Sequence, residues 1–156
     1  MTTMTAFHKD YKTNLLLVDD DPSMVRLLAK IIDRSFGDEI EIQSLTDPTK
    51  ALAILQKDLI DILITDVEMP GADGLELLRC AKRRNSLTQI LFITGHSSLD
   101  TLSDALELGA TDYLLKPLDP AELIELLGQA KKRVQHWRQV LAGTYSARRN
   151  QVPAVC

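Results

Sequence analysis

Hydrophobic residues occur along this chain in two alternating patterns. Short runs rich in leucine, isoleucine and valine predict buried β-strands. Between them lie longer stretches with apolar residues at intervals of three and four, the spacing of an amphipathic helix. The predicted strands are Leu15–Val18, Ile40–Leu45, Ile60–Thr65, Ile90–Ile93 and Tyr113–Leu115. The predicted helices are Pro22–Phe36, Pro48–Lys57, Leu75–Arg84, Ser98–Leu108 and Pro120–Leu141.

Three of these helices begin with the same signal, an aspartate followed by a proline. The pairs Asp21-Pro22, Asp47-Pro48 and Asp119-Pro120 put a carboxylate at the N-cap and a proline at the first helical position. Gly109 stands where a helix C-terminus is expected. Strands that alternate with helices in this way predict an α/β fold, a doubly wound parallel sheet with helices on both faces.

Polar residues follow four of the predicted strands directly. They are Asp19-Asp20, Asp66, Thr94-Gly95 and Lys116-Pro117. In a doubly wound sheet, ligands bind outside the carboxyl ends of the strands. We therefore expect these four segments, distant in sequence, to meet at one edge of the sheet.

The residue types at this edge favour phosphoryl chemistry. Three neighbouring carboxylates repel one another unless a cation lies between them. Oxygen ligands without histidine or cysteine suit Mg²⁺, with Mn²⁺ as the alternative. Lys116 and Thr94 supply a positive charge and a hydroxyl donor for phosphoryl oxygens. Asp66 follows the central strand alone, so we predict that it is the nucleophile and forms an acyl phosphate.

The motifs around these residues resemble a known family. They are Leu16-Leu17-Val18-Asp19-Asp20-Asp21-Pro22, Thr65-Asp66-Val67-Glu68-Met69-Pro70 with Asp73-Gly74, Ile93-Thr94-Gly95, and Gly109-Ala110 through Tyr113 to Lys116-Pro117. In order and spacing they are similar to the receiver domains of two-component response regulators, of the chemotaxis-receiver type. The resemblance runs from about Asn14 to Leu127. Gly95, where the family more often has alanine, and the third acid Asp21 are departures that leave the site residues in place.

The resemblance implies a flavodoxin-like strand order of 2-1-3-4-5 and a role for each acid at the edge. Asp66 would be both phosphoacceptor and metal ligand. Asp20 would bind the metal directly, Asp19 mainly through water, and Glu68 through its main-chain carbonyl.

The resemblance also assigns the remaining site residues and a partner. Thr94 and Lys116 would bind the phosphoryl oxygens, and the peptide bond before Pro117 would be cis. Tyr113 would be a switch residue that turns inward when Thr94 moves, so that the face formed by the fourth helix, fifth strand and fifth helix controls an output partner. The phosphoryl donor would be a histidine kinase or a phosphotransfer protein.

Two other function classes remain open at this point. One is a phosphohydrolase that uses an aspartyl phosphate, similar to the haloacid dehalogenase-like enzymes, in which a second acid follows the nucleophile by two residues. Glu68 stands at that distance from Asp66. The other is a degenerate receiver that only binds partners. Self-limited phosphorylation would favour the receiver, whereas turnover of an added phosphomonoester would favour the hydrolase.

Charge divides the chain into a body and a tail. All 22 acidic residues lie at or before Glu125, together with 12 of the 18 basic ones, which gives −10 there and +6 beyond it. The chain shows no signal peptide or membrane span, so we expect a cytoplasmic protein without a membrane partner. Three basic residues at 131–133 favour a solvated helix face over nucleic-acid binding.

The last predicted helix carries a seam of apolar residues at alternating spacings of four and three. The seam consists of Leu123, Leu127, Ala130, Val134, Trp137 and Leu141. Its first half must face the sheet, so a simple core helix is one interpretation. Its second half has little sheet left to cover, which indicates a partner helix: a homodimer or a helix leading to an output domain. We divide the chain into a flexible segment at 1–13, a receiver domain at 14–128, and an extended helix with a disordered tail, beginning at Ser146, at 129–156.

Overall fold

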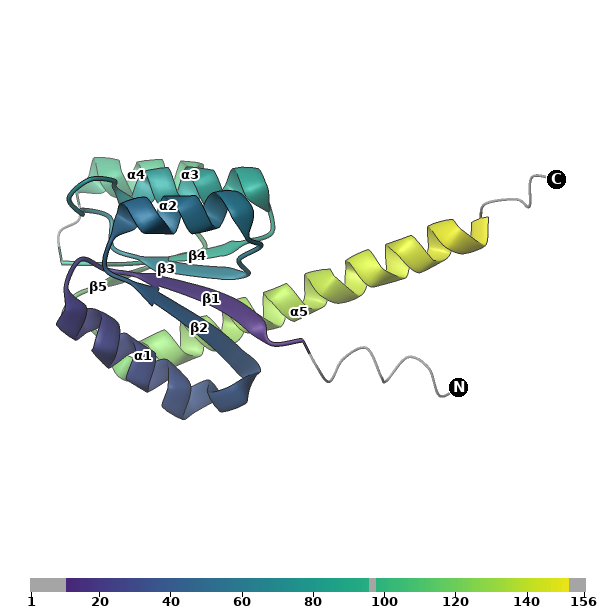
Figure 1. The fold of residues 1–156 in the computed structure, drawn as a ribbon, viewed down its shortest axis with the longest axis horizontal. Coiled ribbons are helices and arrows are strands. Elements are labelled where there is room, and N and C mark those ends of the chain that lie inside the picture. Colours follow the sequence, from purple (N-terminus) through teal and green to yellow (C-terminus); the bar gives the residue numbers. More distant parts are fainter. Residues whose placement is uncertain (1–10, 96–97, 152–156) are drawn as a thin grey trace.

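The computed structural model describes residues 11–95 and 98–151 and contains one parallel sheet with the strand order β2-β1-β3-β4-β5 (Figure 1). The order predicted from the resemblance is therefore confirmed. The strands are β1 (Thr13–Val18), β2 (Ile40–Leu45), β3 (Ile62–Thr65), β4 (Gln89–Thr94) and β5 (Asp112–Leu115). The helices are α1 (Pro22–Phe36), α2 (Pro48–Lys57), α3 (Gly74–Arg84), α4 (Leu99–Glu107) and α5 (Pro120–Gln151), with a short 3₁₀ helix at Gly37–Glu39.

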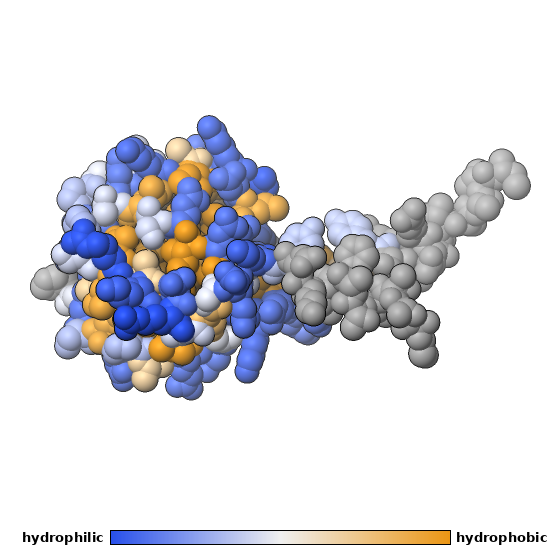
Figure 2. Space-filling model, turned by 60° about the horizontal axis from the view of Figure 1, so that its bottom comes forward, coloured by the Kyte–Doolittle hydropathy of each residue, from blue (hydrophilic) through white to orange (hydrophobic). Residues whose placement is uncertain are grey.

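Helices cover the sheet on both faces, with α1 and α5 on one side and α2, α3 and α4 on the other (Figure 1). Successive residues of a strand point to opposite faces. In β1, Leu15 and Leu17 pack with α1 and α5, whereas Leu16 and Val18 pack with α2 and α3. This double burial explains why the central strands read as continuous apolar runs rather than as alternating ones. Figure 2 shows the α1 and α5 side, where hydrophilic residues cover much of the surface and apolar ones lie between them.

The predicted helix caps are present in the structure. The side chains of Asp21, Asp47 and Asp119 each accept a hydrogen bond from a backbone N–H two residues later, at 2.9 to 3.0 Å. Gly109 lies just beyond the end of α4 and adopts a φ of 98°. Its N–H donates to the carbonyl of Leu106, in the last turn of that helix. The caps at Asp21 and Asp119 lie in the loops after β1 and β5, which carry Asp19, Asp20 and Lys116.

Several predicted boundaries differ from the structure by one or two residues: β1 begins at Thr13, β4 is Gln89–Thr94, α4 is Leu99–Glu107 and β5 begins at Asp112. Two further differences have a visible cause. The third strand begins at Ile62 rather than Ile60, because the Ile60 carbonyl accepts a hydrogen bond from the Thr88 hydroxyl at 2.7 Å instead of entering the sheet ladder. Helix α3 begins one residue earlier than Leu75, since Asp73 caps it by accepting from the Glu76 N–H at 2.8 Å.

The last helix is longer than its sequence pattern indicated. Helix α5 continues through Gln151, so the expected end near Leu141 and the disordered tail from Ser146 are both wrong as far as Gln151. Adding a turn to an existing helix avoids the nucleation penalty, and the first proline after Pro120 is Pro153. Residues 1–10 and 152–156, on which we predicted flexible ends, lie outside the described residues.

Helix α5 leaves the domain at the amino ends of the strands (Figure 1). Basic side chains of the helix itself attach it to the domain there. Arg138 Nη2 lies 2.6 Å from Asp61 Oδ2, and the same oxygen accepts from the Asn14 N–H at 2.8 Å. The guanidinium of Arg138 also lies over the ring of Tyr11, 5.6 Å from its centroid. Asp61 thus joins the starts of β1 and β3 to the outgoing helix.

Two further contacts hold the same part of α5. Arg133 Nε donates to Gln89 Oε1 at 2.7 Å, and Lys131 forms an ion pair with Glu39.

Within residues 11–95 and 98–151, every helix is too short or too polar to cross a lipid bilayer.

We expect the stability difference between the parent protein and Asp61→Asn to depend on pH. Burial raises the pKa of the Asp61 carboxyl, although the Asn14 N–H and the Arg138 charge oppose this shift. A raised pKa in the folded state means that the contribution of this group is fully present below its unfolded pKa of 3.8 and is lost as the pH rises through the folded value. The parent should therefore lose stability relative to Asp61→Asn as the pH rises from about 3.5 to 7 in urea unfolding.

Asp58→Asn, at an exposed position on the loop before β3, is the matched control for this measurement. Its stability difference from the parent should stay nearly constant over the same range. If both variants followed the same pH course, burial of Asp61 would not be its cause.

Candidate functional site

Three of the predicted acids meet at the carboxyl edge of the sheet. Asp19 and Asp20 follow β1, and Asp66 follows the neighbouring strand β3. Each offers a carboxylate oxygen, and these oxygens lie within 4.8 Å of one another. Asp19 and Asp66 are buried and Asp20 is exposed, so the cluster opens to solvent on one side.

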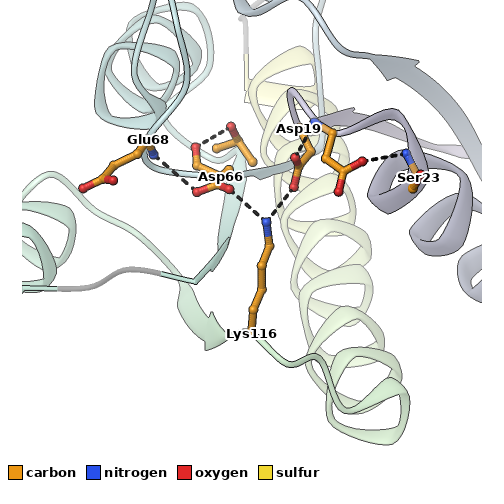
Figure 3. A network of polar contacts seen from close by, with 7 residues as sticks. Asp19, Ser23, Asp66, Glu68 and Lys116 are labelled. Atoms are coloured by element: carbon orange, nitrogen blue, oxygen red, sulfur yellow. Dashed lines mark hydrogen bonds and ion pairs between the residues drawn. The ribbon is translucent and has the colours of Figure 1, made fainter.

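Lys116 reaches this cluster from the end of β5. Its Nζ atom donates to Asp19 Oδ2 at 3.1 Å and to Asp66 Oδ2 at 3.0 Å (Figure 3). The peptide bond between Lys116 and Pro117 is cis, as the resemblance implied. The sequence separation between Lys116 and Asp19 shows that the fold, and not local sequence, creates this contact.

Burial and charge act in opposite directions on the ionisable groups here. Burial raises the pKa of Asp19, although the Asp21 N–H and Lys116 favour its ionised form. Burial alone would lower the pKa of Lys116, but its hydrogen bonds to Asp66 and Asp19 outweigh this effect, so its pKa is raised. Lys116 is therefore charged at neutral pH.

The backbone around Asp66 fixes the direction of its carboxylate. The Asp66 N–H donates to the carbonyl of Val18 at 3.2 Å, and Asp66 Oδ1 accepts from the Glu68 N–H at 3.3 Å. The Thr65 hydroxyl donates to the Asp66 carbonyl at 2.9 Å. One carboxylate oxygen thus faces the loop while the other faces Lys116.

Thr94 and Tyr113 lie beside the cluster, on the strands that follow β3 in the sheet. Thr94 is buried at the end of β4, and its carbonyl accepts from the Lys116 N–H at 2.9 Å. The Tyr113 ring packs against Phe92, with 5.8 Å between the ring centroids. Burial raises the pKa of Tyr113, and the negative charges of Asp66 and Glu68 add to this shift.

The hydroxyl of Tyr113 is buried and has no hydrogen-bond partner within the part of the chain that the structure describes. A buried polar atom of this kind carries a desolvation penalty. The position of the ring therefore depends on packing against its neighbours rather than on a polar contact.

The donor set of the cluster fits a divalent metal. It consists of carboxylate oxygens without histidine or cysteine. Lys116 offsets one of three negative charges, which leaves two for a cation. Hard oxygen ligands with an exposed member, Asp20, are those that Mg²⁺ uses when it keeps several waters.

The sequence motif included Asp73 and Gly74, but their supporting role at the site was not predicted. Asp73 caps α3, and Gly74 lies so close to Asp66 that a side chain would not fit. A Cβ at Gly74 would lie 2.8 Å from Phe92 Cε1 and 3.0 Å from Val67 Cα, and nearer still to the Asp66 carbonyl oxygen. The Asp73-Gly74 pair after the Asp66 loop was the available signal, since it pairs an N-cap residue with the residue that tolerates close backbone approach.

Comparison with known proteins agrees with this geometry. Residues 15–128 match the family described as the response regulator receiver domain. The DNA-binding transcriptional regulator NtrC of Salmonella typhimurium is 34% identical over 123 residues, which cover 79% of this chain and 26% of that protein. The response regulator protein PilR of Pseudomonas aeruginosa is 34% identical over 115 residues, 74% of this chain and 25% of that protein.

The chain thus spans about a quarter of the length of these two relatives. Among solved structures, a response regulator receiver domain protein from Clostridium thermocellum superimposes with a TM-score of 0.73 and 27% identity, over 80% of this chain and 98% of that one. The family match extends over most of the chain and includes every residue of the acidic cluster and Lys116. The chain therefore belongs to the response regulator receiver domain family.

Proposed function

We propose that this receiver domain accepts a phosphoryl group on Asp66 from a histidine kinase or a phosphotransfer protein. The observation that carries the proposal is the position of the Asp66 carboxylate, at the end of the central strand, 3.0 Å from Lys116 and beside two further acids. Asp19 and Asp20 occur as a pair suited to metal binding, whereas Asp66 stands alone after the central strand, with one carboxylate oxygen on the Glu68 N–H and the other on Lys116.

The transfer step needs one nucleophile and a site for negative charge. An Asp66 oxygen would attack the phosphorus, forming an O–P bond as the P–N bond of a phosphohistidine breaks. The departing imidazole nitrogen keeps the bonding electrons and takes up a proton. Lys116 and the Thr94 hydroxyl would bind the phosphoryl oxygens, where charge spreads during transfer. Lys116 would then exchange an Asp66 oxygen for a phosphoryl oxygen without losing Asp19.

Mg²⁺, or Mn²⁺ in its place, would be held by Asp20 directly, by Asp19 mainly through water, by Asp66 and by the main-chain carbonyl of Glu68. The ion would supply positive charge that offsets the phosphoryl oxygens and the carboxylates. The proximity of the three acids supports this assignment for Asp19, Asp20 and Asp66. The assignment of the Glu68 carbonyl is supported by the position of this residue beside the cluster, where its N–H donates to Asp66 Oδ1.

Phosphorylation would shift the population of conformations on the face formed by α4, β5 and α5. Thr94 lies at the end of β4, and the unpartnered Tyr113 hydroxyl gives that ring no polar contact to hold it within the described residues. A phosphoryl group that draws Thr94 inward would change the space beside Tyr113 and so the packing of α4. Through this face the domain would control an output partner in the cytoplasm.

The phosphohydrolase alternative is less well supported by the site. It needs the acid at position 68 to act on the same substrate as Asp66. In Figure 3 the Glu68 carboxylate points away from Asp66 and Lys116, and Glu68 is exposed. A degenerate receiver is also disfavoured, because the three acids lie together and Lys116 contacts two of them, Asp19 and Asp66.

We expect acetyl phosphate to add one phosphoryl group to the chain only when Mg²⁺ or Mn²⁺ is present. Intact-mass spectrometry measures the added mass, and borohydride reduction of the acyl phosphate followed by peptide mapping locates it at Asp66. Labelling should be lost with EDTA and return on adding Mg²⁺.

The same preparation should release no more than trace phosphate from p-nitrophenyl phosphate over many equivalents. Sustained turnover of that ester would favour the hydrolase. Modification at another residue, or equal labelling with EDTA, would contradict the proposed site.

A further inference from the structure

Where α5 leaves the sheet, the helix and two loops of its own domain line a largely apolar pocket of about 180 Å³. The apolar lining residues come from the loops before β3 and β4 and from α5. They are Leu59, Leu87, Val134, Trp137 and Leu141. We call this space the exit pocket. Because Leu59, Trp137 and Leu141 are exposed to 54%, 40% and 43%, an occupant would remove apolar surface from water.

The two polar residues in the lining, Asp61 and Asn85, are already hydrogen-bonded within the domain. Asp61 Oδ2 binds the Asn14 N–H and Arg138, at 2.8 and 2.6 Å. Asn85 Oδ1 accepts from the Leu87 N–H at 3.1 Å. The exit pocket is therefore suited to an apolar group rather than to a hydrogen-bonding one. An apolar cavity of about 150 Å³ can hold a benzene ring, so the exit pocket has room for one phenyl group.

The described chain begins beside this pocket. The Tyr11 ring lies over the guanidinium of Arg138, and the Tyr11 carbonyl accepts from Arg138 Nη1 at 3.5 Å. Val134, Arg138 and Leu141 are spaced by four and three residues, so they share one side of α5. Residues 1–10 are therefore attached to the domain on the side of α5 that lines the exit pocket.

The segment at 1–10 carries one phenylalanine, Phe7. The other two phenylalanines of the chain belong to the described core, Phe92 inside it and Phe36 packed against it. Phe7 is four residues from Tyr11, so an extended chain would let it reach about 13 Å from that residue. Side chains at even separations on an extended chain point to the same side, so Phe7 can face α5 as Tyr11 does.

We propose that Phe7 occupies the exit pocket of its own chain, against Leu59, Trp137 and Leu141. The attachment at Tyr11 favours this occupant over a second copy, because a short connection gives an effective concentration in the millimolar range. A second copy acts only at its concentration in solution. The inference goes beyond the proposed phosphoryl transfer and does not rest on it, so the unphosphorylated protein can test it.

Docking of Phe7 would give α5 a second attachment beside the ion pair of Arg138 with Asp61. It would also cover Trp137 and Leu141, the seam residues for which the sequence predicted a partner helix. The N-terminal segment and a partner helix would then compete for the same apolar side chains. Residues 1–10 would thus regulate access to the outgoing helix.

The test compares the full chain with Phe7→Ala, and Thr3→Ala is the matched control within the same segment. Trp137 is the only tryptophan, so its emission and its quenching by acrylamide report on the exit pocket. Nuclear Overhauser effects between the Phe7 ring and the methyl groups of Leu59 and Leu141 detect the contact itself. Circular dichroism with thermal unfolding checks that each variant is folded.

The parent should show these Overhauser effects and a Trp137 emission that does not change on dilution. Phe7→Ala should lower the equilibrium constant for docking at least about tenfold, the effect of removing a buried phenyl group. Its Trp137 emission should move to longer wavelength, and acrylamide should quench it more strongly. Thr3→Ala should behave as the parent does. In a Leu59→Ala background, Phe7→Ala should change the quenching less, because the two residues share one contact.

Three results would overturn the proposal. The first is equal emission and quenching in the parent and in Phe7→Ala, without Overhauser effects from Phe7. The second is an equal change in Phe7→Ala and Thr3→Ala, or an undiminished effect of Phe7→Ala in the Leu59→Ala background. The third is a Trp137 emission that moves to longer wavelength as the parent is diluted, because a second copy would then be the occupant.

Discussion

Asp66→Asn should abolish labelling by acetyl phosphate while the protein stays folded. The amide is not a nucleophile, so no acyl phosphate can form at this position. The fold should tolerate the change because Lys116 keeps its contact with Asp19 at 3.1 Å and because one of three mutually repelling carboxylates is removed. Intact-mass spectrometry measures the labelling, and thermal unfolding measures the stability.

Asp73→Asn is the matched control for this variant. It makes the same chemical change seven residues away, at an exposed position, and asparagine is as good an N-cap as aspartate. Labelling of Asp73→Asn should equal that of the parent. The nucleophile would be misassigned if Asp66→Asn still took up a phosphoryl group, or if both variants lost labelling together.

Gly74→Val should destabilise the fold by more than about 3 kcal/mol, the upper end of the range for overpacked sites. The added Cβ would meet the backbone of Asp66 and Val67 and the ring of Phe92, and backbone atoms cannot move aside as a side-chain terminus can. Urea unfolding measures the loss. Because the clash falls on the Asp66 carbonyl, any folded fraction should also be labelled more slowly.

Gly128→Ala also adds a side chain at a glycine, but we expect the opposite effect on stability. A Cβ at Gly128 meets nothing within 4 Å, and it lies inside α5, where alanine is favoured by about 1 kcal/mol over glycine. This variant should be slightly more stable than the parent. If Gly74→Val and Gly128→Ala shifted the unfolding midpoint alike, close packing at Gly74 would not explain its effect.

Most of the fold could be predicted because several independent signals agree at each element. The boundaries of α1 and α2 were predicted to the residue, since Asp21-Pro22 and Asp47-Pro48 fix the start and amphipathic spacing gives the length. The strand positions followed from apolar runs. The start of β3 was misplaced because Ile60 is buried like a strand residue, while its carbonyl binds a side chain from another loop.

The site could be predicted as a set of residues but not as a set of contacts. Parallel strands end at a common edge, so Asp19, Asp66 and Lys116 were expected to converge. Periodicity says which face a residue occupies, not which partner it meets. The attachment of Arg138 to Asp61 joins residues 77 positions apart, and nothing local marks either of them.

The tail shows the limit of local propensity. The apolar seam ends at Leu141, where we predicted the end of the helix, yet α5 continues to Gln151. A helix already held by Arg133 and Arg138 extends without a new nucleus. Sequence composition alone does not show that this nucleus is in place.

Because α5 is one continuous helix, the number of residues along it determines the direction in which its end faces. Each residue of an α-helix advances about 1.5 Å and rotates about 100° around the axis. Arg138 and Asp61 set the phase of this rotation at the edge of the domain. Anything joined beyond Gln151 by an unbroken helix would therefore face a direction determined by the number of residues between. One residue added there would turn it by more than a quarter of a circle, whereas seven would return it almost to its starting direction, about 10 Å further out.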